Sequence, residues 1–276
     1  MRILVTGATG FVGKHLLPYL EKRGHEVYAL VRPSTDRSKV YTNHLYVFED
    51  DIEHLASYLL ENHVDGIIHL ASLYIAEHKP ADIKNIVTSN VYLGTAVMEA
   101  AVKAGVKWFL NTGTIWQNYN VEPYSDTFCP VNLYAASKQA FMDMAKYYTE
   151  VSDIRFCTLK LCDTYGANDT RRKIFALFEQ IAKTGECLKM SPGEQKLDIV
   201  HIDKVVRDFE ALAEVLDNGE QLREEYVVSS GRQRSLKEIA KQYEIDHQVT
   251  LNIEWGGRPY RKREVMVPYT GHQLPK

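Results

Sequence analysis

The chain has 276 residues, of which 45% are hydrophobic and 25% are charged, and its net charge at pH 7 is −3. This is the composition of a globular protein, which excludes wholesale disorder, and the near-balance of charge argues against a broad electrostatic grip on nucleic acid. The four cysteines form no Cys-x-x-Cys pair, which fits a reducing compartment without a disulfide framework or a zinc site. No apolar stretch suits a bilayer span or a signal peptide. We therefore expect a cytoplasmic protein that binds no nucleic acid, no membrane and no metal.

The first half of the chain alternates short β-branched runs with longer helical patterns. Near-continuous apolar strands that alternate with helices predict a parallel sheet covered on both faces, which is a doubly wound α/β fold. The expected strands are residues 2–6, 26–31, 66–70, 108–112 and 155–161, and the expected helices are residues 14–23, 52–62, 90–103 and 134–151.

The pattern loosens after Gly166. Helices are expected at residues 173–183, 204–216 and 236–243, with short strands and turns between them. The last twenty residues are rich in glycine and proline and are typical of an ordered loop or arm. We expect two parts, residues 1–165 and a smaller α/β lobe at residues 166–276 that is interleaved with the first.

A glycine-rich turn follows the first expected strand, in the sequence Thr6-Gly7-Ala8-Thr9-Gly10-Phe11-Val12-Gly13. In such a turn one glycine makes the tight bend, one lets backbone amides approach a pyrophosphate, and one lets helix and strand pack closely. The helix N-terminus adds oriented N–H groups and a partial positive charge. The turn predicts a Rossmann-type dinucleotide-binding domain over residues 1–165 and leaves residues 166–276 for the substrate.

The end of the second expected strand indicates which dinucleotide binds. A carboxylate for the ribose usually ends this strand, but Val31 stands in its place and Arg32 follows, with Ser34 and Arg37 close behind. A guanidinium matches a 2′-phosphate through paired hydrogen bonds. We expect NADP(H) rather than NAD(H); the alternative is that Arg32 is a solvated loop residue.

Several motifs in the same order resemble those of the extended short-chain dehydrogenase/reductase family, in its sugar-nucleotide branch, over nearly the whole chain. They lie at residues 6–13, 51–52, 69–72, 90–95, 134–138, 164–166 and 193–203. Residues 111–117 and 130–134 resemble bacterial 4-ketoreductases of 6-deoxy sugar nucleotides, such as the CDP-abequose and CDP-paratose synthases. The resemblance implies a nucleotide-sugar substrate and a homodimer formed through the helices at residues 90–103 and 134–151.

The glycine turn, the strand-end residues and the resemblance together give the expected contacts to the cofactor. They are Thr6, Gly7, Thr9, Gly10, Phe11, Val12, Gly13, Arg32, Ser34, Arg37, Asp51, Ile52, Leu70, Ala71, Ser72, Asn90, Tyr134, Lys138 and Leu161.

Tyr134 and Lys138 are four residues apart and so share one face of a helix. An ammonium close to a phenol favours the phenolate and lowers its pKa from about 10, so the tyrosine could exchange a proton near neutral pH, as ketone reduction requires. The alternative is a merely structural pair on a helix surface. The resemblance adds Thr112 as the hydroxyl that would hydrogen-bond the substrate carbonyl, with Thr114 as the runner-up.

Departures from the family's patterns narrow the reaction. Gly113-Thr114 stands where related 4,6-dehydratases carry Asp-Glu, and Thr114 stands where related epimerase–reductases carry a cysteine. Epimerases that retain NAD carry the ribose acid that Val31 replaces. We therefore expect NADPH-dependent reduction of the C4 ketone of a nucleotide-linked 4-keto-6-deoxy sugar, with a CDP-sugar favoured. An NAD-retaining C4 epimerase and a non-catalytic dinucleotide-binding regulator stay open as alternatives.

The substrate site is expected between the catalytic residues and the second lobe. Guanidinium groups suit a diphosphate, and Arg258 resembles a diphosphate ligand of the family, whereas Leu197 stands where an arginine is usual. The expected substrate contacts are Thr112, Thr114, Trp116, Asp163, Arg171, Arg172, Gln195 and Arg258.

Overall fold

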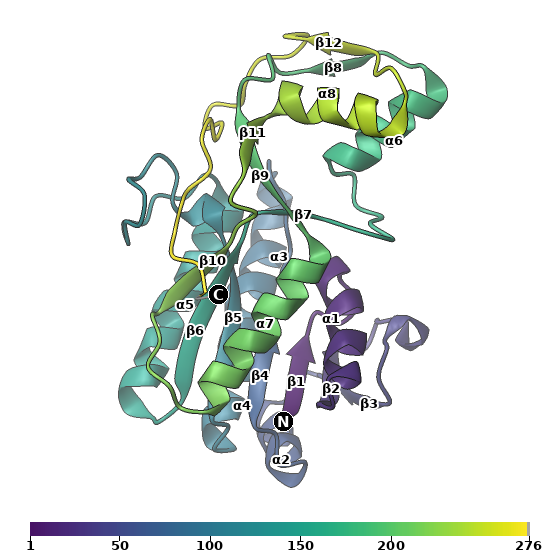
Figure 1. Ribbon diagram of the computed structural model, residues 1–276. Helices are drawn as coiled ribbons and strands as arrows, with labels where there is room; N and C mark the ends of the chain where they lie inside the picture. Colours follow the sequence, from purple (N-terminus) through teal and green to yellow (C-terminus); the bar gives the residue numbers. More distant parts are fainter. Residues whose placement is uncertain (275–276) are drawn as a thin grey trace.

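The computed structural model describes residues 1–274 and has a seven-stranded sheet at its centre, in the order β10-β6-β5-β4-β1-β2-β3 (Figure 1). All neighbouring strands of this sheet run parallel. The order reverses beside β1, so ligands are expected at the carboxyl ends of the strands there. The sheet confirms the doubly wound α/β fold. Its strands are β1 (Arg2–Thr6), β2 (Glu26–Val31), β3 (His44–Val47), β4 (Gly66–His69), β5 (Trp108–Thr114), β6 (Arg155–Leu161) and β10 (Glu225–Val228).

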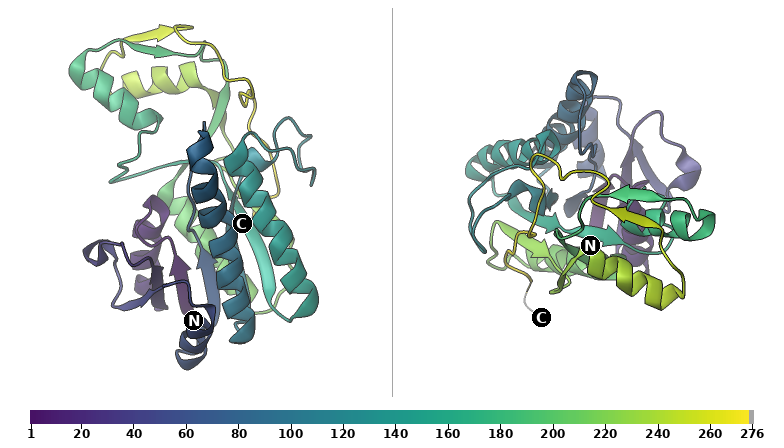
Figure 2. Two further views of the ribbon diagram at one scale, coloured as in Figure 1. Left: turned by 180° about the vertical axis from the view of Figure 1, so that it is seen from behind. Right: turned by 90° about the horizontal axis from the view of Figure 1, so that it is seen from above.

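Helices cover both faces of the sheet over two separate apolar cores. One core lies under α1 (Phe11–Lys22) and α7 (Ile202–Asp217), on the face seen in Figure 1. The other lies under α2 (Ile52–Glu61), α4 (Leu93–Lys103) and α5 (Leu133–Val151), on the face seen in the left view of Figure 2. Within residues 1–274, every helix is too short or too polar to cross a membrane.

The second lobe stands above the carboxyl ends of the strands (Figure 1). Its small apolar core includes Phe178, Ile181 and Leu236. Its elements are β7 (Asp163–Tyr165), α6 (Ile174–Thr184), β8 (Leu188–Met190), β9 (Lys196–His201), β11 (Gln233–Ser235), α8 (Leu236–His247) and β12 (Ile253–Trp255), which form a β11-β9-β7 sheet and a β12-β8 pair. Between β9 and β11 the chain returns to the large sheet as α7 and β10.

Several elements differ from their predicted limits. Helix α1 begins at Phe11, directly after the extended Gly10, and α8 continues to His247, where Gln248 in the left-handed region ends it. A five-residue π-helical turn, Thr88–Tyr92, precedes α4 and follows α3 (Ile83–Val87). Strand β3 was not predicted, because four residues at a sheet edge carry little periodic signal. Short 3₁₀ turns occur at Arg37–Lys39, Pro80–Asp82 and Ile115–Gln117.

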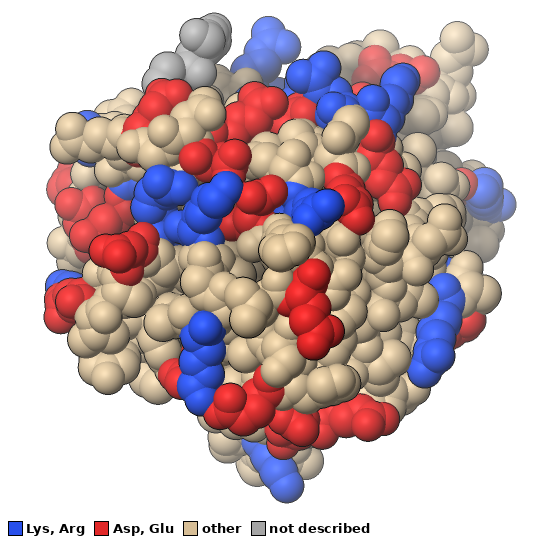
Figure 3. Space-filling view, turned by 90° about the horizontal axis from the view of Figure 1, so that it is seen from below, with Lys and Arg blue, Asp and Glu red and all other residues tan. Residues whose placement is uncertain are grey.

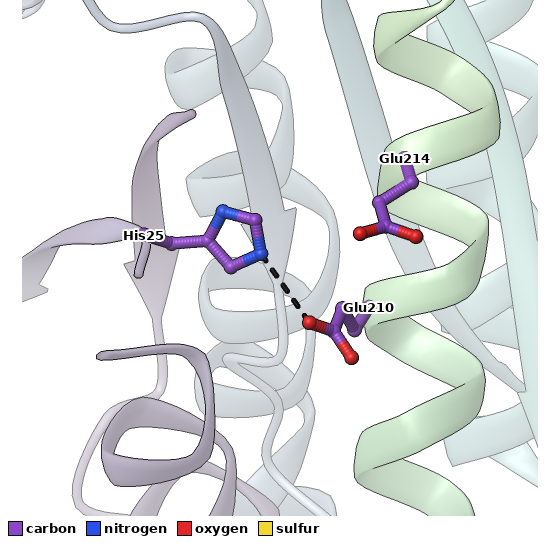
Figure 4. Close-up of side chains that lie close together, drawn as sticks. All are labelled: His25, Glu210 and Glu214. Carbon is purple, nitrogen blue, oxygen red and sulfur yellow. Dashed lines mark ion pairs between the residues drawn. The ribbon is translucent and has the colours of Figure 1, made fainter. Parts of the chain in front are cut away.

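A polar cluster lies between the loop that follows α1 and helix α7, where His25 points toward Glu210 and Glu214 (Figure 4). His25, Glu210 and Glu214 bring three potential ligand atoms within 4.8 Å of one another. Glu210 is already paired, however, because it accepts hydrogen bonds from Arg23 Nε at 2.7 Å and from Tyr19 Oη at 2.7 Å. The Arg23 guanidinium neutralises the carboxylate, so the cluster ties the two helices together and does not call for a cation.

The end of the molecule below the sheet carries acidic and basic side chains side by side, without one dominant sign (Figure 3). An interspersed surface of this kind lacks the basic stripe that a nucleic-acid backbone requires.

Candidate active site

Two adjoining cavities lie at the carboxyl ends of the strands. The smaller, of about 250 Å³, runs from the glycine turn to Thr112, Tyr134 and Lys138. The larger is a cleft of about 1480 Å³ bounded by residues of the second lobe. Tyr74, Trp116 and Asp163 line both, so the two cavities form one continuous site.

The glycine turn is packed too closely to accept side chains. At Gly7, whose φ is +73°, a Cβ would lie 2.7 Å from the backbone nitrogen of Ala71; at Gly13 it would lie 2.5 Å from the carbonyl oxygen of Gly7. Gly10 caps α1 without a side-chain hydrogen bond, and the first turn holds no acidic residue. The first amides of α1 therefore lack partners inside the helix, and their residues, Phe11, Val12 and Gly13, line the small cavity, an arrangement that fits a pyrophosphate.

The structure places the remaining predicted cofactor contacts in three settings. Leu70, Ser72 and Leu161 line the small cavity with Phe11 and Val12. Arg32, Ser34 and Arg37 are exposed in the loop after β2, and Thr9 is half-buried in the turn. The others stabilise the surrounding structure. Thr6 is fully buried and accepts a hydrogen bond from the amide of Ala71, and Asn90 is hydrogen-bonded to Leu73 and Ser137. Asp51 caps α2 by accepting from the amide of His54, and Ile52 packs beside the second core.

Thr112 and Thr114 lie on β5 beside the start of α5, which Asn132 caps by accepting from the amide of Ala135 at 3.0 Å. Thr114 Oγ1 accepts a hydrogen bond from the amide of Trp116. The buried Thr112 Oγ1, in contrast, has no hydrogen-bond partner among residues 1–274. The uncommitted hydroxyl that lines the small cavity is therefore that of Thr112.

Lys138 is 1% exposed, and its Nζ has no hydrogen-bond partner within the described chain. Burial lowers the pKa of Lys138 to about 8. Burial also raises the pKa of Tyr134 to about 12, while a hydrogen bond from Ser72 acts in the opposite direction. The predicted lowering of the tyrosine pKa was wrong, because loss of hydration destabilises the phenolate and Lys138 does not offset this. Tyr134 is thus protonated at neutral pH and can act as an acid.

The predicted substrate contacts divide between the two cavities. Arg172, Gln195 and Arg258 line the large cleft, while Trp116 and Asp163 line both cavities. Arg171 differs from the prediction, since it lines the small cavity and not the cleft. Its guanidinium carbon lies 3.9 Å from the centre of the Phe11 ring, beside the glycine turn.

Several cations that line the cleft are already paired with carboxylates. Lys173 lies 3.1 Å from Asp163, and Arg261 lies 2.8 Å from Glu77. Arg172, Arg234 and Arg258 line the cleft and have no carboxylate within 4.0 Å in the part of the chain described. These three guanidinium groups are available to an anionic ligand; Arg263, which also lines the cleft, is instead hydrogen-bonded to Cys129 and lies over the ring of Tyr119.

Sequence reasoning missed two residues of the site. Arg234 on β11 is directly opposite Leu197 on β9, so both point to the same face of the small sheet and both line the cleft. The leucine at position 197, where the family usually carries an arginine, indicated that another arginine could take its place. The sequence did not reveal that Arg234 is the residue paired with Leu197. Tyr74 lies with its ring centre 5.1 Å from that of Tyr134 and 5.7 Å from that of Trp116. It occupies a loop, where no pattern marks it.

The fold and the continuous site define a dinucleotide-dependent enzyme of Rossmann type with a second lobe above the sheet. The chain belongs to the NAD dependent epimerase/dehydratase family, whose sequence profile matches residues 3–229. This confirms the predicted family and the prediction of an enzyme that uses a nicotinamide dinucleotide.

Individual relatives agree with this assignment. The chain is 31% identical to CDP-abequose synthase from Salmonella typhimurium over 244 residues, covering 86% of this chain and 78% of that protein. It is 30% identical to CDP-abequose synthase from Yersinia pseudotuberculosis over 270 residues, covering 97% and 92%. The structure of UDP-glucose 4-epimerase from Thermotoga maritima, with UDP-glucose, matches with a TM-score of 0.84 over 99% of this chain and 90% of that one at 21% identity, which shows the same fold.

Proposed function

We propose that the protein reduces the C4 ketone of a nucleotide-linked 4-keto-6-deoxy sugar with NADPH, and that the nucleotide is CDP. The observation that carries the proposal is the convergence of Thr112, Tyr134 and Lys138 on a cavity that begins at the glycine turn and opens into the large cleft. The two similar CDP-abequose synthases support a sugar nucleotide and the cytidine base.

Each side chain has a role in this reaction, for which the dinucleotide supplies the hydride. Tyr134, protonated at neutral pH because its pKa is about 12, donates a proton to the ketone oxygen. The free Thr112 hydroxyl hydrogen-bonds the same oxygen and orients it. Lys138 Nζ, which lacks a protein partner in the described structure, binds the ribose and, while charged, stabilises Tyr134 as it loses its proton.

The surroundings of β5 favour plain reduction over elimination of water. A side chain at Gly113 would place its Cβ 2.7 Å from Thr158 and 2.8 Å from Lys160, so this position has no room for a carboxyl group. Thr114 is committed to capping. Neither position can supply the acid or base that elimination needs.

The preference for NADPH is supported by the end of β2, where Val31 is buried and Arg32 is exposed. The nearby Asp36 is bonded to Ser38 and Lys39 and so is not free for a ribose. Replacing Arg32 with alanine should raise the Kd for NADPH about tenfold, by loss of a charge-assisted contact, and leave the Kd for NADH within twofold. Equal effects on both dinucleotides would contradict the preference.

The substrate diphosphate is proposed to bind Arg172, Arg234 and Arg258 in the large cleft.

A homodimer is proposed through the face formed by α3, the π-helical turn and α5. Apolar side chains are exposed there, namely Val87 (45%), Tyr92 (43%), Met144 (46%), Tyr147 (62%) and Val151 (59%). Light scattering of the purified protein tests this assembly.

The reaction is tested by following absorbance at 340 nm with NADPH, or with NADH, and 4-keto-6-deoxy sugars linked to CDP, dTDP or GDP. Stoichiometric loss of NADPH with the CDP-sugar, abolished in Tyr134→Phe, is the expected result. Interconversion of C4 epimers without net consumption of cofactor would instead favour the epimerase, whose fold this chain shares. Tight dinucleotide binding without turnover of any sugar would favour a regulator.

A further inference from the structure

Two adjacent arginines at the start of the second lobe serve different cavities. Arg171 lines only the small cavity and Arg172 only the large cleft. We propose that Arg171 is a positioning residue for the dinucleotide: it fastens residues 164–171 of the second lobe onto the first turn of α1. This rests on the proposed dinucleotide site but is independent of the sugar.

The contact with α1 is made at the residue that opens the helix. The Arg171 guanidinium stacks on the ring of Phe11, with 3.9 Å between its carbon and the ring centre. One turn later His15 packs edge-on against Phe11 at 5.1 Å, and its Nε2 lies 3.0 Å from the carbonyl oxygen of Ala167. Both Arg171 and Ala167 therefore hold the face of α1 that begins at the glycine turn.

The guanidinium is held rigidly by its own segment. Nε and Nη2 each donate to the Asp169 carboxylate at 2.7 Å, Nη2 also donates to the Thr164 carbonyl at 2.8 Å, and Nη1 donates to Thr164 Oγ1 at 3.1 Å. Four of the five N–H groups of the guanidinium are thus engaged. A guanidinium whose N–H groups are already bonded is poorly suited to bind a phosphate directly. It does, however, keep a fixed stacking position over the ring of Phe11.

The Arg171 guanidinium lies beside the part of α1 that is proposed to bind the dinucleotide. Phe11 follows Gly10 directly, and the amides of the first turn of α1 are the groups that fit a pyrophosphate. Without the stacked guanidinium, Phe11 and this turn lose a fixed neighbour, and binding must then restore their order. Arg172 has no carboxylate partner in the described residues and lines only the large cleft, so it is the matched control.

The test measures dinucleotide affinity without any sugar substrate. NADPH and NADH are titrated by fluorescence into the wild type, Arg171→Met, Arg171→Lys, Asp169→Asn and Arg172→Met, and CDP is titrated by calorimetry. For Arg171→Met we expect the Kd for NADPH to rise about tenfold, with CDP affinity unchanged. Arg171→Lys should recover only part of the loss, because an ammonium lacks the planar fork. Arg172→Met should show the reverse pattern.

The outcomes separate this inference from the proposed function. A wild type that binds neither dinucleotide would remove the cofactor site itself. A wild type that binds NADPH, together with Arg171→Met or Asp169→Asn variants of unchanged affinity, would overturn the role of Arg171 alone. If Arg171→Met does not fold, the Arg171→Lys and Asp169→Asn variants decide the question, since both retain side chains of nearly the same size.

Discussion

The small cavity and the large cleft meet at Tyr74, Trp116 and Asp163, but most of the residues that line them come from different parts of the chain. The small cavity is lined by the glycine turn, by residues at the ends of β4 and β5, and by Tyr134 and the buried Lys138 in the first turns of α5. The cleft is walled by long side chains from α6, α8, β9, β11 and residues 258–268. The first therefore depends on backbone room and on a few buried groups, and the second on charge, so substitutions in each should change different measurements.

The largest effect is expected from Tyr134→Phe, which removes the proton donor. Because general acid catalysis contributes about 10²- to 10⁴-fold, kcat should fall by at least that lower figure, while the Kd for NADPH stays within twofold. Steady-state rates and fluorescence titration measure the two quantities. Tyr147→Phe, an exposed position on the same helix, is the control. A loss of NADPH affinity equal to the loss of rate would contradict the role of acid.

The backbone nature of the small cavity is tested by two glycines with similar positive φ. A Cβ at Gly7 would meet the backbone of Ala71 at 2.7 Å, whereas a Cβ at Gly24 would meet nothing within 4 Å. Gly7→Ala should abolish measurable NADPH binding. Gly24→Ala should keep NADPH binding, and its only effect should be a loss of stability of about 1–2 kcal/mol, seen as a lower Tm, because alanine is strained at this positive φ. Normal NADPH affinity in Gly7→Ala would refute this account of the turn.

The charge of the cleft is tested by Arg234→Ala and Arg258→Ala. Hydrogen bonds to charged groups contribute about 1.5–3 kcal/mol, so each variant should raise KM for the nucleotide sugar about tenfold or more, with the Kd for NADPH unchanged. Lys183→Ala is the control, because Lys183 lines the same cleft but is paired with Glu179 at 2.5 Å. The same KM in Arg234→Ala as in the control would exclude Arg234 from the site.

The smallest effect is expected from pH. Burial lowers the pKa of Lys138 to about 8, so the ammonium is present below that pH and is lost as pH rises through it. The pKa of Tyr134, about 12, keeps this proton donor intact over the same range. Reductive kcat should therefore be level below pH 7 and fall to about half near pH 8. A rate that rises with pH would show that the tyrosine must first ionise.

The same comparison explains what could be predicted from the sequence. The small cavity was predicted largely in one piece, because its residues belong to short motifs at strand ends and on one helix face. Arg234 was missed because its place depends on the register between β11 and β9, 37 residues apart at Leu197. The division between Arg171 and Arg172 depends on Asp169 and Phe11, and the shift in the Tyr134 pKa depends on burial. The periodic pattern of the sequence predicts neither the different positions of these two arginines nor the raised pKa of Tyr134.

Because the chain returns to the large sheet as α7 and β10, the second lobe cannot be removed or exchanged as one continuous segment. A chain cut after residue 165 would leave β6 as an open edge and the core beneath α7 uncovered. The lobe above the sheet is thus two inserts in a single host, one before α7 and one after β10. A transplant of this lobe must exchange both inserts together, because β9 from the first pairs with β11 from the second.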